Sequence, residues 1–376
     1  MASGDSNLFF SRDTKVYLEQ GSNIWEIPVL NGYSFSQSTN SSTITLEEMS
    51  DATGGSRRGQ RVFNDSVSPA EWSFDVYIRP TIATALHRCV EEPLWANFVG
   101  QNSMTPGSPD TWAVGVTIGA SNLDFDFDDS NKSTLGTFSL YFVLGGNQVS
   151  GRNYVANEVT TIYKIPNCVV NEATINFEVD GISMISWSGM GGNATEQASF
   201  DASAAIIRGI SSTDNYVRNR LTALTATSSV SGGSKTYGIT LTGGSITLSN
   251  NISFLTPESL GIVNQPIGHV TGTRSVSGNF TAYMDEATNG TIDLLSDLQG
   301  ALTTVTNSFA LDFYVGGKAG TDTPVGPGMQ FKMGQAHLEI PTINADDVMA
   351  IEVNFTALPS TISGTNEVTR VRYVGA

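Results

Sequence analysis

The chain contains two copies of one sequence pattern, and this repeat constrains the fold more than any single motif does. Thr137-Phe-Ser-Leu-Tyr-Phe-Val-Leu-Gly-Gly146 matches Ser308-Phe-Ala-Leu-Asp-Phe-Tyr-Val-Gly-Gly317. Each run has the β-branched and aromatic content of a strand and is closed by a Gly pair. Because self-similarity at this scale indicates repeated structural units, we predict two copies of one all-β unit.

The repeat extends upstream of these runs. The segment 71–79 matches the segment 278–285, with Phe74 opposite Phe280. In both segments apolar and polar residues alternate, which is typical of a strand with one face toward a core. Each unit is therefore expected to own a strand that is apolar inside and polar outside.

A helix-like stretch follows each of these strands, over residues 81–99 in the first copy and 289–298 in the second. Pro93 is expected to end or kink the first helix. The shared order of strand, strand, helix and strands predicts a first domain over 1–200 and a second over 201–376 with a C-terminal tail. Domains of this length lie within the usual range.

The composition points away from nucleic-acid binding and toward an assembly. Of 376 residues, 19 are Lys or Arg and 36 are Asp or Glu, which gives a net charge of −17. Such a chain offers no basic track to phosphates, although DNA could pass an acidic surface without sticking. The charged fraction of 15% is well below the roughly 25% of an average protein. Either other subunits cover much of the surface, or Ser, Thr and Asn supply its polarity.

The two cysteines, Cys89 and Cys168, are expected to be buried free thiols, since two in so long a chain are not a disulfide framework. The first residues show no signal peptide, and no apolar run reaches the ~18 residues of a membrane helix. We expect a protein that is made and assembled in a cytoplasm, without membrane contact.

No catalytic or metal site is predicted. His87, His269 and His337 are scattered, and none stands at metal-ligand spacing with a cysteine or another histidine. The run Gly189-Met-Gly-Gly192 is followed by no phosphate-binding lysine, so it is interpreted as a linker and no cofactor is expected.

The run Asp124-Phe-Asp-Phe-Asp-Asp129 resembles the start of a calcium loop, but the sixth and twelfth positions are Asp129 and Leu135 where that loop needs Gly and Glu. A strand with Asp124, Asp126 and Asp128 on one solvated face fits the period better. A bound cation is the minor alternative.

Arg57, Arg58 and Arg61 form the tight basic cluster of the first half, on and just after a Gly-rich loop over 50–60. It is either a solvated loop or an arm whose arginines meet an acidic surface on a neighbouring subunit. The tail carries a strand-like run with Arg370 and Arg372 on one side.

Several segments together resemble the tail tube (major tail) proteins of long-tailed bacteriophages, and the resemblance covers almost the whole chain. The segments are Thr14-Lys-Val-Tyr-Leu, Trp25-Glu-Ile-Pro, Tyr33-Ser-Phe-Ser-Gln, Trp72-Ser-Phe-Asp-Val-Tyr-Ile, Phe138 to Leu144, Ala173-Thr-Ile-Asn-Phe, Ile185-Ser-Trp-Ser-Gly189 and Tyr216-Val-Arg-Asn-Arg-Leu. No single motif is diagnostic, since strand order defines this family.

The resemblance implies a mainly β fold with two tandem tail-tube-type β-sandwich or barrel-segment domains, each flanked by an α-helix. It also implies a structural virion protein, not an enzyme, whose sheets join in rings that stack into a tube for DNA ejection. A chain with tandem units resembles the subset in which three chains make a pseudo-six-fold ring. The implied partners are further copies of the chain, and the tape measure, baseplate, terminator and, in a contractile tail, sheath proteins. DNA would pass without specific binding.

Strand geometry agrees with three chains. If each unit gives four strands, a ring of about 24 strands at ~4.8 Å spacing and a tilt near 40° is roughly 48 Å across its backbones. This passes a duplex on the order of 20 Å wide, whereas about 12 strands would block it.

Strand parity then gives candidate positions. The candidates for the channel wall are Ser73, Asp75, Asn279, Thr281 and Glu352. The candidates for contact between rings are Arg57, Arg58, Arg61, Arg370 and Arg372. Rival interpretations are a baseplate or tail-completion protein, a capsid decoration protein, a bacterial surface or carbohydrate-binding protein, and an enzyme.

Overall fold

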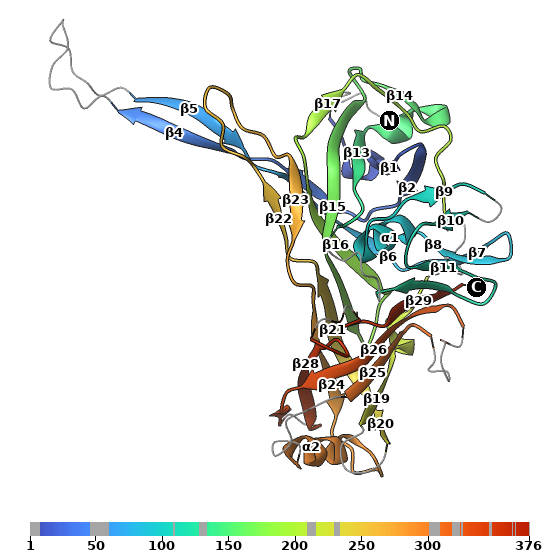
Figure 1. Ribbon diagram of the computed structural model, residues 1–376. Coiled ribbons are helices and arrows are strands. Elements are labelled where there is room, and N and C mark those ends of the chain that lie inside the picture. The colour runs from blue at the N-terminus through green and yellow to red at the C-terminus, as the bar shows by residue number, and fades with distance from the viewer. Residues whose placement is uncertain are drawn as a thin grey trace, which may run out of the picture.

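The structure is a computed structural model (Figure 1). It describes residues 8–45, 60–107, 110–127, 134–208, 216–228, 234–300, 309–317, 324, 326–345, 348–362, 364 and 366–375.

Strands make up most of the described chain. The first half holds β1 (Lys15–Gln20), β2 (Asn23–Ile27), β3 (Ser34–Ser36), β4 (Thr39–Thr45), β5 (Gln60–Val67), β6 (Ala70–Tyr77), β7 (Pro80–Ala83), β8 (Leu86–Cys89), α1 (Glu92–Val99), β9 (Met104–Thr105), β10 (Thr111–Trp112), β11 (Val116–Ile118), β12 (Leu123–Asp126), β13 (Phe138–Leu144), β14 (Asn153–Val155), β15 (Thr161–Glu178), β16 (Met184–Gly191), β17 (Thr195–Gln197) and β18 (Ser199–Asp201). The second holds β19 (Ala223–Ser228), β20 (Lys235–Ile239), β21 (Leu241–Ser249), β22 (Ile252–Leu255), β23 (Gly268–Thr271), β24 (Ser275–Tyr283), α2 (Thr291–Gly300), β25 (Phe309–Val315), β26 (Gly328–Leu338), β27 (Thr342–Asn344), β28 (Ala350–Ala357) and β29 (Arg370–Val374). Short 3-10 turns lie at Ser11–Asp13, Gly146–Gln148, Ser150–Arg152 and Asn219–Leu221.

Strand pairing repeats between the halves. The first unit pairs β1 with β2 and β13, β13 with β15, β15 with β16, β16 with β6, and β6 with β3. The second pairs β19 with β20 and β25, β25 with β26, β26 with β28, β28 with β24, and β24 with β21. All these pairings are antiparallel, and Phe74 and Phe280 take equivalent places in them. The mainly β fold built from a repeated unit is therefore confirmed.

One sheet runs through both units, and we call it the bridging sheet. Its strands lie in the order β3, β6, β16, β15, β21, β24, β28 and β27, so that each unit supplies four. Within this sheet, the units are linked by the pairing of β15 with β21. Because the sheet is continuous there, the domain division at residue 200 stays a prediction.

The long strand β15 belongs to two layers. Up to Cys168 it pairs with β13, and from Val169 it pairs with β16. A register shift between Val170 and Glu172 marks a bulge near this transition, and bulges bend strands in this way. The two layers enclose the core, which includes Trp72, Trp95 and Trp187.

The first helix differs from the prediction over 81–99. Residues 80–89 form the hairpin β7–β8, whose turn holds Thr84 and Ala85 at φ of 53° and 61°, and α1 begins only at Glu92. Pro93 lies in the first turn of α1, where its missing N–H costs nothing, so it starts the helix and does not end it. The second predicted helix is confirmed as α2.

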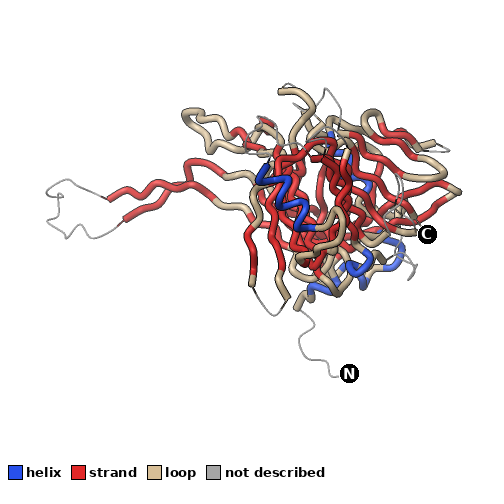
Figure 2. Tube along the Cα trace, turned by 90° about the horizontal axis from the view of Figure 1, so that it is seen from below, coloured by secondary structure: helices blue, strands red, loops and turns tan. Residues whose placement is uncertain are grey.

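Two arms interrupt the repeat at the same place. The hairpin β4–β5 lies between β3 and β6 in sequence, and β22–β23 lies between β21 and β24. Figure 1 shows the first arm extending far from the body with the second beside its base, and Figure 2 shows the same projection from below. Backbone hydrogen bonds join them, since Val67 donates to the carbonyl of Asn264 and Asn264 donates to that of Asp65.

Candidate assembly surface

The two faces of the bridging sheet have opposite chemistry. One packs on the core and is apolar, with Phe74, Trp187, Ile175, Ile246 and Phe280 all buried. The other carries hydroxyl, amide and carboxylate groups, and we call it the polar face. It includes Ser34, Ser36, Ser73, Asp75, Ser186, Ser188, Thr174, Asn176, Ser245, Thr247, Asn279, Thr281, Glu352, Asn354, Thr342 and Asn344. This alternation follows from the two-residue period of a strand.

Charge on the polar face has one sign. The carboxylates are Glu71, Asp75, Glu172, Glu178 and Glu352. No Lys or Arg occurs among the described residues of the strands that form this sheet, which are β3, β6, β16, β21, β24, β27, β28 and the part of β15 from Val169. A surface of this kind repels phosphate and releases no counterions from DNA.

The five channel-wall candidates all lie on this face. Ser73 and Asp75 are on β6, Asn279 and Thr281 on β24, and Glu352 on β28. The register makes Ser73 equivalent to Asn279 and Asp75 equivalent to Thr281, since they flank Phe74 and Phe280.

Hydrogen bonds tie these side chains together across strands. Asn279 donates through Nδ2 to Oε1 of Glu352 at 2.9 Å and accepts a hydrogen bond from Ser245 Oγ at 2.9 Å. Thr242 Oγ1 donates to Thr281 Oγ1 at 2.9 Å. In the first unit, the Ser34 and Ser73 hydroxyls lie 2.8 Å apart. These hydrogen bonds orient the side chains that make them on the polar face.

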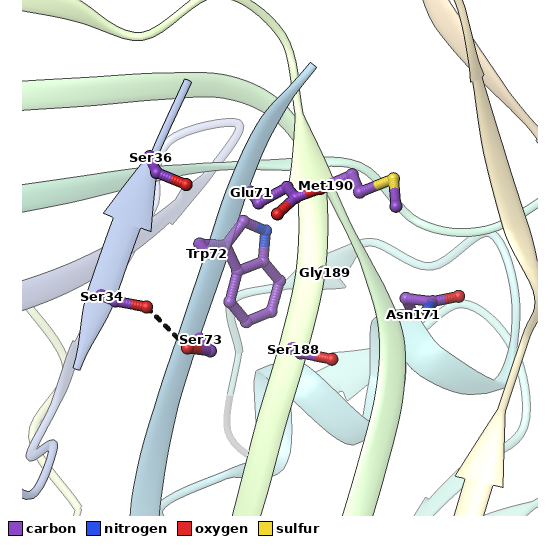
Figure 3. A pocket seen from close by; sticks show the side chains of 9 residues that line it. All are labelled: Ser34, Ser36, Glu71, Trp72, Ser73, Asn171, Ser188, Gly189 and Met190. Atoms are coloured by element: carbon purple, nitrogen blue, oxygen red, sulfur yellow. Dashed lines mark hydrogen bonds between the residues drawn. The ribbon is translucent and has the colours of Figure 1, made fainter. Parts of the chain in front are cut away.

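A shallow hollow lies on the first-unit part of this face. Its lining includes Ser34, Ser73, Ser188, Asn171 and the ring of Trp72 (Figure 3). Glu71 is the titratable group of that lining, and it has no histidine or cysteine beside it. Elsewhere too, no group of three or more His, Cys, Asp or Glu side chains in the described ranges could hold a metal ion.

The arms expose apolar side chains. Ile44, Val62 and Phe63 on β4–β5 are all about half exposed. The β22–β23 arm and the loop between its strands expose Leu255, Leu260, Ile262, Ile267 and Val270. Exposed apolar side chains on segments that project from the body are typical of an interaction site.

The basic candidates for ring-to-ring contact do not lie together. Arg57 and Arg58 lie outside the described residues, and Arg61 is exposed on β5 at the far part of the first arm. Arg370 is half-buried on β29, whereas Arg372 is buried and bonded to Asp124 on β12. This placement does not favour contact of Arg372 with another ring.

The expected solvated acidic face over 124–128 is wrong for Asp124. Its carboxylate is buried because the guanidinium of Arg372, on the paired strand β29, neutralises it. The pattern of alternating Asp and Phe gave no sign of a cation 248 residues further along the chain.

Sequence reasoning missed part of the candidate assembly surface. Glu71, Glu172 and Glu178 are the further carboxylates of the polar face. The alternation that places Phe74 on the core face also places these three on the polar face, once β15 and β6 are known to lie in one sheet. The exposed apolar residues of the first arm carried a weaker signal, the adjacent pair Val62-Phe63 within an otherwise mostly polar run over 60–67.

A repeated β unit, a sheet shared by both units, an acidic polar face and two arms with exposed apolar side chains are the features of a structural protein without a catalytic centre in its described residues. A comparison with family models finds "Phage tail tube protein" over residues 41–357, and the chain belongs to this family. It is 30% identical over 372 residues to "Tail tube protein pb6" of Escherichia phage T5, an alignment that covers 95% of this chain and 74% of that protein.

Membership of the family makes the protein a structural component of the phage virion tail, not an enzyme. Among the described residues, neither helix is long and apolar enough to cross a membrane.

Proposed function

We propose that three copies of this chain close into a pseudo-six-fold ring, that the bridging sheets of the three copies line its channel, and that the rings stack into the tube. The observation that carries this proposal is the bridging sheet itself, with four strands from each unit and one polar, acidic face. Three such sheets give a ring of about 24 strands, which is wide enough for a DNA duplex by the barrel geometry described in the sequence analysis.

The channel wall is the polar face. Ser73, Asp75, Asn279, Thr281 and Glu352 would face the bore, and their carboxylates would repel the phosphates of the genome. Since binding to DNA gains from released counterions only where cations meet phosphate, DNA slides past such a wall without specific binding. The opposite face is excluded because it packs on the core.

Rings stack through the arms. The β4–β5 arm with Arg61 projects beyond the body and exposes Val62 and Phe63. Burying such side chains against the next ring would stabilise the stack by roughly 25 cal/mol for each Å² of apolar surface removed from water. Arg57 and Arg58, in the sequence between β4 and β5, remain candidates for the same contact.

Further partners follow from a place in the tail. A tape measure protein would fill the bore before ejection, and baseplate and terminator proteins would meet the two ends. In a contractile tail a sheath protein would surround the tube.

Electron microscopy of the purified chain at high concentration tests the proposal. We expect hollow tubes of even bore. The double variant Val62→Asp, Phe63→Asp should give isolated rings, because charge on the arm opposes its burial, whereas the matched control Asn64→Asp should still give tubes. Compact monomers at every concentration would contradict the proposal and favour a baseplate or tail-completion role.

A further inference from the structure

The junction between the two units inside one chain has a defined cross-strand pattern. Where β15 meets β21, three successive pairs are Thr174 with Thr247, Ile175 with Ile246, and Asn176 with Ser245. The two threonine hydroxyls are 3.1 Å apart on the polar face. Ile175 and Ile246 are both 0% exposed on the core face. The junction thus consists of a hydroxyl pair, an apolar pair and an amide–hydroxyl pair.

The second unit holds a copy of the β15 side of this junction. Thr174, Ile175 and Asn176 pair with residues 186, 185 and 184 of β16. Thr342, Ile343 and Asn344, which are β27, pair with residues 352, 351 and 350 of β28. β28 is the counterpart of β16, and both strands place an isoleucine opposite the central isoleucine. The three residues of β27 are therefore the equivalents of Thr174-Ile-Asn176, and their identities are the same.

The first unit holds a copy of the β21 side. On β21, Ser245 lies opposite Asn279 of β24, and on β3, Ser34 lies opposite Ser73 of β6. Since Ser73 and Asn279 are equivalent, Ser34, Phe35 and Ser36 are the equivalents of Ser245, Ile246 and Thr247. The chemistry is kept: hydroxyl, apolar and hydroxyl.

Both copies lie at the edges of the bridging sheet. In the described part of the chain β27 pairs with β28 alone and β3 pairs with β6 alone. All three residues of β27 are exposed, and Ile343 is 46% exposed although its counterpart Ile175 is fully buried. Phe35 is only partly buried against Phe142 and Tyr163. An unpaired edge with an exposed apolar side chain is a template for another strand.

We propose that β27 of one copy pairs antiparallel with β3 of the next copy, in the register Thr342 with Ser36, Ile343 with Phe35, and Asn344 with Ser34. The intermolecular junction then repeats the internal one pair by pair: hydroxyls meet on the polar face, and Ile343 covers Phe35 on the core face. A one-residue slip would set Ile343 opposite Ser34 or Ser36, so that the core face of one copy would meet the polar face of the next. The short edges are protected from random pairing, since three residues offer few backbone hydrogen bonds. This inference rests on the proposed ring. The pairing of β27 with β3 of the next copy is the contact that would join its chains, and we call it the joint.

Engineered cysteine pairs test the register. The variants Thr342→Cys with Ser36→Cys and Asn344→Cys with Ser34→Cys are matched pairs. Their Cα atoms would lie about 4.5–5.5 Å apart, within reach of a disulfide. Crossed pairs use the same four positions: Thr342→Cys with Ser34→Cys, and Asn344→Cys with Ser36→Cys. A two-residue offset adds roughly 6.6 Å along the strand, which puts a disulfide out of reach. The native Cys89 and Cys168 are both buried, and single-cysteine variants give the background.

Each variant is assembled under reducing conditions, checked for tubes by microscopy, oxidised and run on a non-reducing gel. We expect both matched pairs to give bands of covalent dimers and trimers. In the crossed pairs, these bands should be no stronger than in the single-cysteine variants. Tubes in which the crossed pairs link, or in which neither matched pair links, overturn the register but leave the tube function standing. If the unmodified chain forms neither rings nor tubes, the proposed function and the joint both fail. Two matched pairs keep the test valid if one substitution prevents folding.

Discussion

Arg372 on β29 binds Asp124 on β12 through two hydrogen bonds of 2.6 Å, so a salt bridge joins the last strand of the second unit to a strand of the first. The two residues are also cross-strand partners, and both are 8% exposed. A buried carboxylate is costly without a partner. The pair therefore couples the stability of the two units.

Removing one partner is expected to destabilise the chain. Arg372→Ala leaves Asp124 buried without its cation and should lower the free energy of unfolding by about 3–5 kcal/mol. The double variant Asp124→Leu, Arg372→Met should recover most of this loss, because no charge is left buried. Urea unfolding measures both. Equal stability of Arg372→Ala and the parent would show that the pair is solvated.

A buried carboxylate beside α1 gives stability a pH dependence. Burial raises the pKa of Glu91 to about 7, although Tyr373 donates a hydrogen bond to its Oε1 at 3.1 Å. Because the folded pKa lies above the unfolded value near 4.3, the protonated acid contributes stability that is full below pH 4.3 and lost as pH rises through 7.

The variant Glu91→Gln should flatten this dependence. Gln stays neutral at every pH, so the melting temperature of the variant should fall less than that of the parent between pH 5 and pH 8. On the order of 3 kcal/mol is at stake, given the size of the shift. Thermal unfolding across this range checks it, with the exposed Glu71→Gln as the control. Parallel curves for Glu91→Gln and the parent would contradict the assignment.

A glycine lies opposite a large aromatic residue in each unit, but the strand that carries the glycine differs between the units. In the first unit Gly189 lies opposite Trp72, and in the second Gly278 lies opposite Phe355. A Cβ at Gly278 would lie 2.0 Å from the carbonyl oxygen of Ser245 and 2.7 Å from the Phe355 ring. Gly278→Val should therefore cost about 1–3 kcal/mol or more through overpacking.

Gly238 is the matched control, since a Cβ there meets nothing within 4 Å. Denaturant midpoints compare Gly278→Val with Gly238→Val. Similar small losses in the two variants would show that the space over Gly278 is open.

Charge reversal on the polar face tests its role toward DNA. The variant Asp75→Lys, Glu352→Lys should still form tubes, because neither residue lies on an arm or at a joint. Its tubes should retain short duplex DNA with a steep dependence on salt, whereas parent tubes should not. The neutral variant Asp75→Asn, Glu352→Gln controls for lost hydrogen bonds. If the parent tubes retained as much duplex DNA as the lysine variant, the channel wall would not repel DNA as proposed.

Much of the fold follows from local pattern. The parity of Phe74 and Phe280 was sufficient to place Ser73 and Asn279 on one face, since a strand has a period of two. The helix predicted over 81–99 is confirmed only over 92–99, because Thr84 and Ala85 adopt positive φ in a hairpin turn, a conformation that neither residue type signals. Pro93 starts α1 and does not end it, because proline is tolerated in the first turn of a helix as well as after its end.

Long-range partners could not be read from the sequence. The burial of Asp124 depends on Arg372, and the projection of the arm depends on where β3 and β6 leave the sheet. The three residues of β27 are too few for a periodic signal. Their equivalence with Thr174-Ile-Asn176 emerges only from the register of the strands on which both lie.

Electron cryomicroscopy of assembled tubes tests the central claim most directly, because it counts the chains in each ring and shows which face of the bridging sheet meets the bore. We expect three chains per ring, with Ser73 and Asn279 facing the channel. Six chains per ring, or Phe74 and Phe280 lining the channel, would contradict this account.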